Sequence, residues 1–347
     1  MNPRTDQEQF FFSLTPDVVL SAVESTGLLC TGRCFALNSY ENRVYDVEVE
    51  IEAEGNSTEG HYNDRALRQR RVIKFYRPGR WTRDQILEEH QFIADLNENE
   101  VPAIGPLRFP NGDTLASTPE GIQYAIFPRV GGRAPEEMQP EQLRWLGRLL
   151  ARMHSTGQQR QAPHRIHLNQ KTYGLDALAE LEQGGWLPLE IHSAYRDTVN
   201  RICERAERLL EPFSVHRLHG DCHLGNLLWN AQGALQGPSF LDFDDMVNGP
   251  AVQDLWLVLP GRPGSDSVAR DQLDFLLDGY ESIKDFDRSQ LSLIEALRAL
   301  RMIHYAAWIS RRWQDPAFPA AFPQFNTPRY WQDQLADLRV QLEILTT

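Results

Sequence analysis

The stretch Leu218–Asp245 reads LHGDCHLGNLLWNAQGALQGPSFLDFDD and carries the most informative pattern in the chain. Three polar residues stand between its short apolar runs: Asp221, Asn226 five residues later, and Asp242 sixteen residues after that. The apolar runs flank a segment rich in glycine, so they predict a loop, a short strand, a turn at residues 233–238 and a second strand. The acidic residues then follow the end of the second strand.

This spacing meets the needs of phosphoryl transfer from ATP. That reaction uses an Asp to orient the attacking hydroxyl and accept its proton, and an Asn and a second Asp to hold Mg²⁺ on the phosphates. In protein kinases the first Asp and the Asn occur in the motif H-R-D-x-x-x-x-N, and the second Asp is the first residue of D-F-G. Here the pair reads H-G-D-x-x-x-x-N, and the second motif reads D-F-D. Either motif alone could be a polar turn, but the two in order favour a shared role.

The composition narrows the kinds of partner. The chain has 347 residues, of which 41% are hydrophobic and 24% charged, which is typical of a soluble globular protein. A net charge of −13 argues against nucleic acid as the main partner. The four cysteines have no C-x-x-C spacing, and the N-terminus lacks a signal-like apolar segment, so we expect a cytoplasmic protein with reduced thiols and no membrane span. Cys222 and His223 alone cannot close a zinc site and are interpreted as loop residues.

Upstream, Arg71–Pro78 predicts a strand that ends at proline, with Lys74 among its apolar residues. Such a lysine either protects a sheet edge or binds the α- and β-phosphates, as in V-A-I-K. The downstream motifs favour the second role. The preceding segment, Leu37–Tyr45, occupies the position of a phosphate-covering loop but is not G-x-G-x-x-G. Ser39 is its candidate phosphate contact, although a turn alone would also explain a serine.

The helix after this strand supplies a partner for the lysine. Thr82 and Gln85 form a predicted capping box at its start. Glu89 falls on the apolar stripe of this helix, which consists of Ile86, Ile93 and Leu96. A carboxylate on an apolar face needs a partner, and Lys74 is the natural one. Glu88 lies off the stripe and better fits a solvated residue.

Residues 124–132, YAIFPRVGG, predict a strand that breaks at Pro and Gly-Gly. This pattern suits a hinge whose backbone binds adenine, and Phe127 and Val130 are the candidate contacts. The chain is mainly helical beyond this point. We therefore expect an N-terminal lobe at 1–128, which contains the nucleotide-binding sheet and one paired helix. The mainly helical C-terminal lobe is expected at 129–347 and carries the catalytic and metal-binding loops. Residues 53–70 predict an exposed loop between two strands.

The helical half contains other candidates. His154 ends an apolar stripe and is interpreted as a core-facing or helix-end histidine rather than a catalytic one. Aromatic residues and arginines gather at 305–313, where they either line a substrate groove or pack in the core with a solvated edge. Helices are predicted at 15–27, at 193–210 and at about 328–344. Two or more helices are predicted within 270–313, and one of them carries the mostly buried residues between Leu291 and Ala307.

Longer blocks resemble a family of bacterial stress-response kinases related to aminoglycoside phosphotransferases and choline kinases. The blocks are Leu37–Tyr45, Val72–Pro78, Asp84–Phe92, Phe127–Arg133, Leu218–Asn226 and Asn248–Trp256. The resemblance implies an α+β, two-lobed protein-kinase-like fold, with a small antiparallel-sheet lobe and a larger, mainly helical lobe. It further implies a cytoplasmic, monomeric serine/threonine protein kinase with ATP as co-substrate, Mg²⁺ as cofactor and a protein substrate.

The same resemblance implies roles for individual residues. Asp221 would accept the proton, Asn226 and Asp242 would hold Mg²⁺, and Ser39 would lie near ATP. The family equivalent of Asp254 braces the catalytic loop, which implies a supporting structural role.

Two other functions stay open on sequence grounds. The first is a small-molecule hydroxyl kinase of the choline, homoserine or aminoglycoside type, because the catalytic motifs alone do not separate it from a protein kinase. The second is a nucleotide-dependent binding module without turnover. The full set of Lys74, Glu89, Asp221, Asn226 and Asp242 argues against this second function. No A-P-E motif ends an activation loop, so control by loop phosphorylation is not supported.

Overall fold

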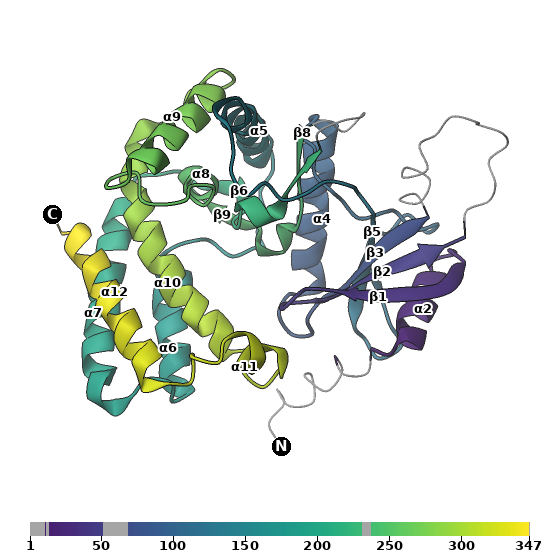
Figure 1. Ribbon diagram of the computed structural model, residues 1–347, viewed down its shortest axis with the longest axis horizontal. Coiled ribbons are helices and arrows are strands. Elements are labelled where there is room, and N and C mark those ends of the chain that lie inside the picture. Colours follow the sequence, from purple (N-terminus) through teal and green to yellow (C-terminus); the bar gives the residue numbers. More distant parts are fainter. Residues whose placement is uncertain (1–10, 12–13, 51–68, 231–236, 347) are drawn as a thin grey trace. The chain divides into compact units, whose positions relative to one another are not determined.

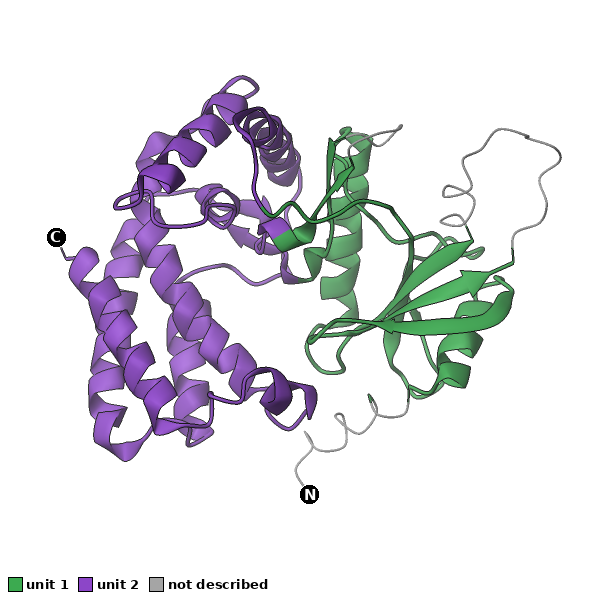
Figure 2. Ribbon diagram, viewed as in Figure 1, with its two compact units in different colours: residues 1–136, 225–244 green, residues 137–224, 245–347 purple. Residues whose placement is uncertain are grey.

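The computed structural model describes residues 11, 14–50, 69–230 and 237–346. The chain forms two compact units, one of residues 1–136 and 225–244 and the other of residues 137–224 and 245–347 (Figure 2). The first contains an antiparallel sheet and the second is mainly helical, which confirms the expected α+β class (Figure 1). Residues 53–68, expected to form an exposed loop, and 233–236, expected in a turn, lie outside the described residues.

The sheet of the first unit has the order β1-β2-β3-β5-β4, and all of its pairs are antiparallel. Its strands are β1 (Cys30–Leu37), β2 (Arg43–Val49), β3 (Arg70–Phe75), β4 (Ala116–Ser117) and β5 (Gln123–Pro128). Lys74 of β3 pairs with Val44 on one side and Ala125 on the other. It therefore lies in a central strand, and the alternative that it protects a sheet edge is wrong.

Alternation along the strands gives the sheet two different faces. Helix α2 (Pro16–Glu24) packs Val19 and Val23 against one face, which includes Ile73 and Phe75. Thr15 caps this helix as predicted, although the helix ends at Glu24, before the expected limit at residue 27. Lys74 lies on the opposite face, which is the face that its ion-pair partner Glu89 of helix α4 reaches. The sheet thus has an apolar face and an opposite face that carries the Lys74–Glu89 ion pair.

Helix α4 (Arg83–Glu98) begins as the sequence predicts. The Thr82 hydroxyl accepts a hydrogen bond from the Gln85 backbone N–H, and the Gln85 side chain accepts one from the Thr82 N–H. Ile86 and the partly buried Trp81 share an apolar cluster. These contacts fix where the helix starts, and hence which of its residues face the sheet.

A hairpin from the later half of the sequence belongs to the first unit. Strands β7 (Leu227–Asn230) and β8 (Gly237–Phe240) pair with each other, so both predicted strands are present, although Gly237 and Pro238 were expected in the turn and belong to β8. The Phe240 carbonyl accepts a hydrogen bond of 2.8 Å from the Ile104 N–H, and Arg133 and Trp229 exchange two backbone bonds. The expected division into lobes at 1–128 and 129–347 stays a prediction. The compact units are defined by contacts between residues, and the first unit therefore includes this hairpin from far along the chain.

The second unit consists of helices around two short strands. Its longer helices are α5 (Pro140–Gln158), α6 (Asp176–Gln183), α7 (Leu189–Leu210), α9 (Ser267–Glu281), α10 (Ile294–Ser310) and α12 (Pro328–Ile344). The shorter elements are α8 (Val252–Trp256), α11 (Ala317–Ala321), η1 (Lys171–Leu175), η4 (Arg288–Leu293) and strands β6 (His216–Leu218) and β9 (Val247–Gly249). The turns η2 (Leu224–Asn226) and η3 (Phe243–Asp245) span the boundaries between the units. Among the described helices, none combines the length and the apolar character needed to cross a membrane.

Two glycines allow α5 and α9 to approach each other closely (Figure 1). A Cβ atom on Gly147 would lie 2.0 Å from the Leu276 carbonyl oxygen. A Cβ atom on Gly279 would lie 2.0 Å from the Arg144 carbonyl oxygen. Both neighbours are backbone atoms, which cannot move aside as a flexible side chain could.

The substitution Gly279→Ala should therefore destabilise the second unit. Because the added methyl group must push two helices apart, we expect a loss of about 1–3 kcal/mol in the free energy of unfolding. Urea unfolding followed by circular dichroism measures this loss. Gly264→Ala is the matched control, since a Cβ atom there meets nothing within 4 Å. An unfolding midpoint for Gly279→Ala equal to that of Gly264→Ala would contradict the packing argument.

Candidate active site

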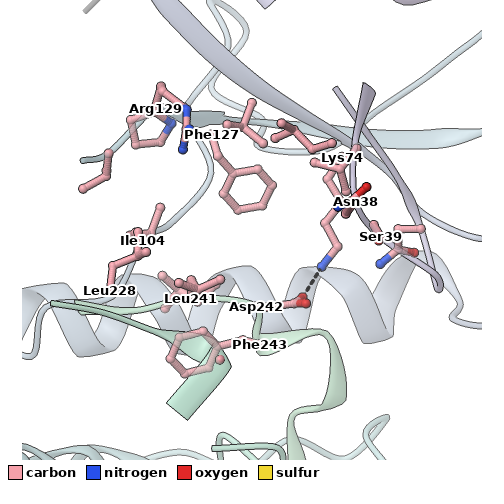
Figure 3. A pocket seen from close by; sticks show the side chains of 18 of the residues that line it. Asn38, Ser39, Lys74, Ile104, Phe127, Arg129, Leu228, Leu241, Asp242 and Phe243 are labelled. Carbon is pink, nitrogen blue, oxygen red and sulfur yellow. Dashed lines mark hydrogen bonds and ion pairs between the residues drawn. The ribbon is translucent and has the colours of Figure 1, made fainter. Parts of the chain in front are cut away.

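A buried ammonium group among three carboxylates forms the centre of the candidate site. The Lys74 Nζ atom lies 2.9 Å from Asp242 Oδ1, 3.2 Å from Asp244 Oδ1 and 3.9 Å from Glu89 Oε1. Figure 3 shows the lysine reaching across the cavity to Asp242. Burial by itself would lower the pKa of this ammonium, but the carboxylates, above all Asp242, raise it well above its ordinary value. The lysine is therefore a fixed positive charge. The predicted pairing of Lys74 with Glu89 is present.

Polar side chains surround Glu89 of α4. Its side chain is 1% exposed. The Tyr76 hydroxyl lies 3.5 Å from Glu89 Oε1 and 2.9 Å from His90 Nε2, and His90 Nδ1 lies 2.8 Å from the Thr114 hydroxyl. A carboxylate on an apolar face is thereby given polar partners, as the sequence pattern requires.

Asp242 has an unusual backbone. Its φ is +60°, a left-handed conformation that non-glycine residues adopt rarely and that often marks functional sites. Its side chain is half-exposed at the end of β8. Immediately before it, the Leu241 N–H donates a hydrogen bond of 3.0 Å to the Asn226 carbonyl. The structure thus brings the segments of Asn226 and Asp242 side by side.

Asp244 is a central residue that the sequence analysis missed. It is 2% exposed, pairs with Arg80 and accepts a hydrogen bond of 3.2 Å from the Asn42 amide. Asn42 in turn accepts a bond from the Arg77 N–H, so the loop between β1 and β2 is tied to this carboxylate. The repeated Asp in LDFDD was the available signal. Within a run of acidic residues, however, the sequence does not reveal which one is buried.

A cavity of about 310 Å³ opens beside Lys74. Ser39, Phe127, Val130 and Asp242, all predicted as site residues, line it together with Lys74 and Glu89. Figure 3 shows the Phe127 ring on one side of the cavity and Ile104, Leu228 and Leu241 on the other. The cavity therefore has an apolar part and a charged part, and the Lys74 cluster forms the charged part.

The remaining predicted residue, Asp221, belongs to the second unit. Its Oδ1 lies 2.7 Å from a terminal nitrogen of Arg301 on α10, and its Oδ2 lies 3.4 Å from His223 Nε2. Burial alone would raise the pKa of this carboxyl, but His223 and Arg301 together lower it to about 2. Asp221 is therefore ionised at neutral pH. Arg301 was not anticipated from the sequence, because it lies eighty residues further along the chain.

Asp254 holds the backbone of the loop that carries Asp221. Its two oxygens accept hydrogen bonds from the N–H groups of His219 (2.9 Å) and Gly220 (2.8 Å). His154, fully buried, lies 3.3 Å from the same carboxylate and 3.0 Å from the Tyr280 hydroxyl. Although burial would raise the pKa of Asp254, the bond with His154 and the neighbouring charges lower it. The predicted bracing geometry is thus present, and His154 is core-facing as expected.

The glycine in H-G-D has a physical reason. Gly220 has a φ of +83°, and a Cβ atom on it would lie 2.2 Å from the Asp245 carbonyl oxygen. Gln253 donates a further hydrogen bond of 2.9 Å to the Gly220 carbonyl. The loop therefore has no room for the arginine that protein kinases have at this position.

Comparisons with known proteins identify the family of this chain. The sequence profile of the phosphotransferase enzyme family matches residues 38–286. Stress response kinase A of Escherichia coli (strain K12) is 40% identical over 336 residues, which cover 96% of this chain and 94% of that protein. Serine/threonine protein kinase RdoA of Salmonella typhimurium is 39% identical over the same shares of both chains. The sequence-based resemblance is confirmed.

A solved structure supports the fold independently. Amicoumacin kinase hAmiN, in complex with AMP-PNP, Ca²⁺ and Ami, matches with a TM-score of 0.63 over 91% of this chain and 93% of that one. Its sequence identity is 17%, so the likeness bears on the fold alone. The family profile and the full-length relatives carry the assignment further: this chain belongs to the phosphotransferase enzyme family.

Proposed function

We propose that this protein is an ATP- and Mg²⁺-dependent serine/threonine protein kinase of a bacterial stress response. The observation that carries the proposal is the Lys74 ammonium, held by Glu89, Asp242 and Asp244 beside a cavity with an apolar slot. Phosphoryl transfer from a nucleotide needs such a positioned positive charge beside a site for the base. Relatives that match nearly the whole chain bear the names stress response kinase A and serine/threonine protein kinase RdoA, which supports the acceptor class.

The nucleotide would occupy the cavity of the first unit. The adenine would lie in the slot between Phe127 and the apolar side chains opposite, where the backbone around Val130 supplies hydrogen bonds. Lys74 would contact the α- and β-phosphates, and Glu89 would keep the lysine in place. Ser39 and its neighbouring backbone would approach the phosphates from the loop between β1 and β2. Because the transition state is loose, positioning and charge neutralisation do most of the work.

Asn226 and Asp242 have the donors that Mg²⁺ prefers, since both side chains offer oxygen atoms. The half-exposed carboxylate of Asp242, on a strained backbone beside the Asn226 segment, fits this role. When bound, the ion would neutralise charge on the phosphate oxygens.

Asp221 would act on the acceptor. It would accept a hydrogen bond from the attacking Ser or Thr hydroxyl, whose oxygen forms a bond to the γ-phosphorus while the bond to the bridging oxygen of ADP breaks. The proton would pass to Asp221 late in the step. A pKa of about 2 makes Asp221 a weak base, which suits a carboxylate that mainly orients the hydroxyl.

Two substitutions should separate catalysis from nucleotide binding. Asp221→Asn should abolish phosphoryl transfer but leave the Kd for Mg²⁺-ATP unchanged, because Asp221 contacts the acceptor and not the nucleotide. Asp242→Asn should weaken Mg²⁺-ATP binding, because the amide removes a negative charge from the metal site. Calorimetric titration of both variants, with and without Mg²⁺, measures these effects. Normal Mg²⁺-dependent binding by Asp242→Asn would contradict the metal assignment.

Transfer of label from γ-labelled ATP tests the acceptor class. We expect Mg²⁺-dependent label on Ser or Thr residues of protein, and none with Asp221→Asn. The acceptors offered are the protein itself, a generic protein, a cell lysate, choline, homoserine and an aminoglycoside. Label on a small molecule alone would retain the phosphotransferase chemistry and replace the protein acceptor.

A further inference from the structure

We propose that Arg301 is a specificity-determining residue, which makes the acceptor site favour hydroxyls next to an anionic group and disfavour acceptors that carry an ammonium group. The inference rests on the proposed role of Asp221 and goes further, because it names the charge of the acceptor. In protein terms, the preferred acceptor is a Ser or Thr flanked by acidic residues.

Arg301 lies next to the carboxylate that the acceptor hydroxyl must approach. Its terminal nitrogen lies 2.7 Å from Asp221 Oδ1, within the second unit. The acceptor hydroxyl must come within about 3 Å of the same carboxylate to donate its hydrogen bond. The guanidinium and the reacting hydroxyl therefore lie within roughly 8 Å of each other, since both contact the same carboxylate group. A charged substituent next to the hydroxyl would therefore lie within the range of the charge on Arg301.

The chemistry of this arginine decides which substituents fit. A guanidinium has five N–H donors arranged in a planar fork and has no acceptor. Its side chain is 35% exposed, so the arginine that pairs with Asp221 is also partly accessible from solvent. A carboxylate or phosphate on the acceptor would meet these donors, whereas an ammonium group would be repelled.

The charge around Asp221 supports the same conclusion. One carboxylate oxygen faces Arg301 and the other faces His223. A site for a cationic acceptor needs surplus negative charge, and this carboxylate already has a guanidinium beside it. An acidic acceptor would instead supply Arg301 with a second anionic partner.

The helix that carries Arg301 extends the surface beyond a single small molecule. Tyr305, one turn further along α10, is 44% exposed and stacks on Trp308 with ring centroids 5.4 Å apart. Arg301 and Trp308 are seven residues apart, about 10 Å along a helix. A surface of this length suits a segment of polypeptide better than a small alcohol.

A matched set of peptides tests the inference. Each contains one Ser, flanked by Glu in the first peptide, by Ala in the second and by Lys in the third. For the wild-type protein we expect kcat/KM to be about tenfold higher with the Glu peptide than with the Lys peptide, because the comparison combines one attractive and one repulsive charge contact, both partly exposed. In Arg301→Gln this ratio should fall to about one, and in Arg301→Lys it should largely persist. Arg311→Gln is the control, because Arg311 lies at the end of the same helix and pairs with Glu180.

Binding of non-reacting peptides, in which Ala replaces the acceptor Ser, provides a readout that does not need turnover. Tighter binding of the Glu version by wild type, lost in Arg301→Gln and kept in Arg311→Gln, supports the inference even if no peptide is labelled. If the peptides bind in this way but none is labelled, the protein-kinase proposal fails, whereas the preference of the Arg301 site for an anionic ligand is supported. Equal binding of the two versions, no binding of either, or a Glu preference that survives in Arg301→Gln overturns the inference.

Discussion

An ammonium group inside a protein needs negative charge around it, because the loss of hydration is too costly otherwise. Lys74 has three carboxylates within 4 Å, from α4 and from the segment that follows β8. This single group therefore connects the central strand of the sheet, the helix beside it and the end of a hairpin that comes from far along the chain. The sheet sets its position, since β3 lies between β2 and β5.

The cluster around Lys74 contains three carboxylates and one ammonium group. A second positive charge, that of Arg80, also pairs with one of these carboxylates. Arg80 pairs with Oδ2 of Asp244, whereas Lys74 pairs with Oδ1 of the same carboxylate. Asp244 is fully buried, whereas Asp242 is half-exposed and has a strained backbone. Two neighbouring aspartates thus have different environments. The inner one holds the structure together, and the outer one keeps the access that a metal ligand would require.

A buried carboxylate organises the second unit in a similar way, although its partners are backbone N–H groups. Asp254 accepts two of them from consecutive residues, and His154 and Tyr280 extend the network into the helices. The loop before Asp221 is thereby fixed to the interior. Arg301 then pairs with the side chain of Asp221, which follows this loop segment. Backbone position and side-chain orientation have separate supports.

The sequence predicted the residues that conflict with their local pattern. Lys74 in an apolar strand and Glu89 on an apolar stripe each required a charged partner, and the capping box fixed the register of α4. The helix expected at about 328–344 also matches α12, because Thr327 and Pro328 mark its start clearly. Asp244 and Arg301 could not be predicted. An acidic run hides the first, and the second is one of many arginines whose partner is set by tertiary packing alone.

Gly220 has an evolutionary consequence. Both its backbone conformation and the nearby Asp245 carbonyl exclude any side chain at this position. A single codon change from Gly to Arg would therefore cost the loop its shape before the new guanidinium could be useful. The H-G-D loop of this chain and the H-R-D loop of protein kinases therefore cannot be interconverted by a single substitution without a shift of the backbone around Gly220.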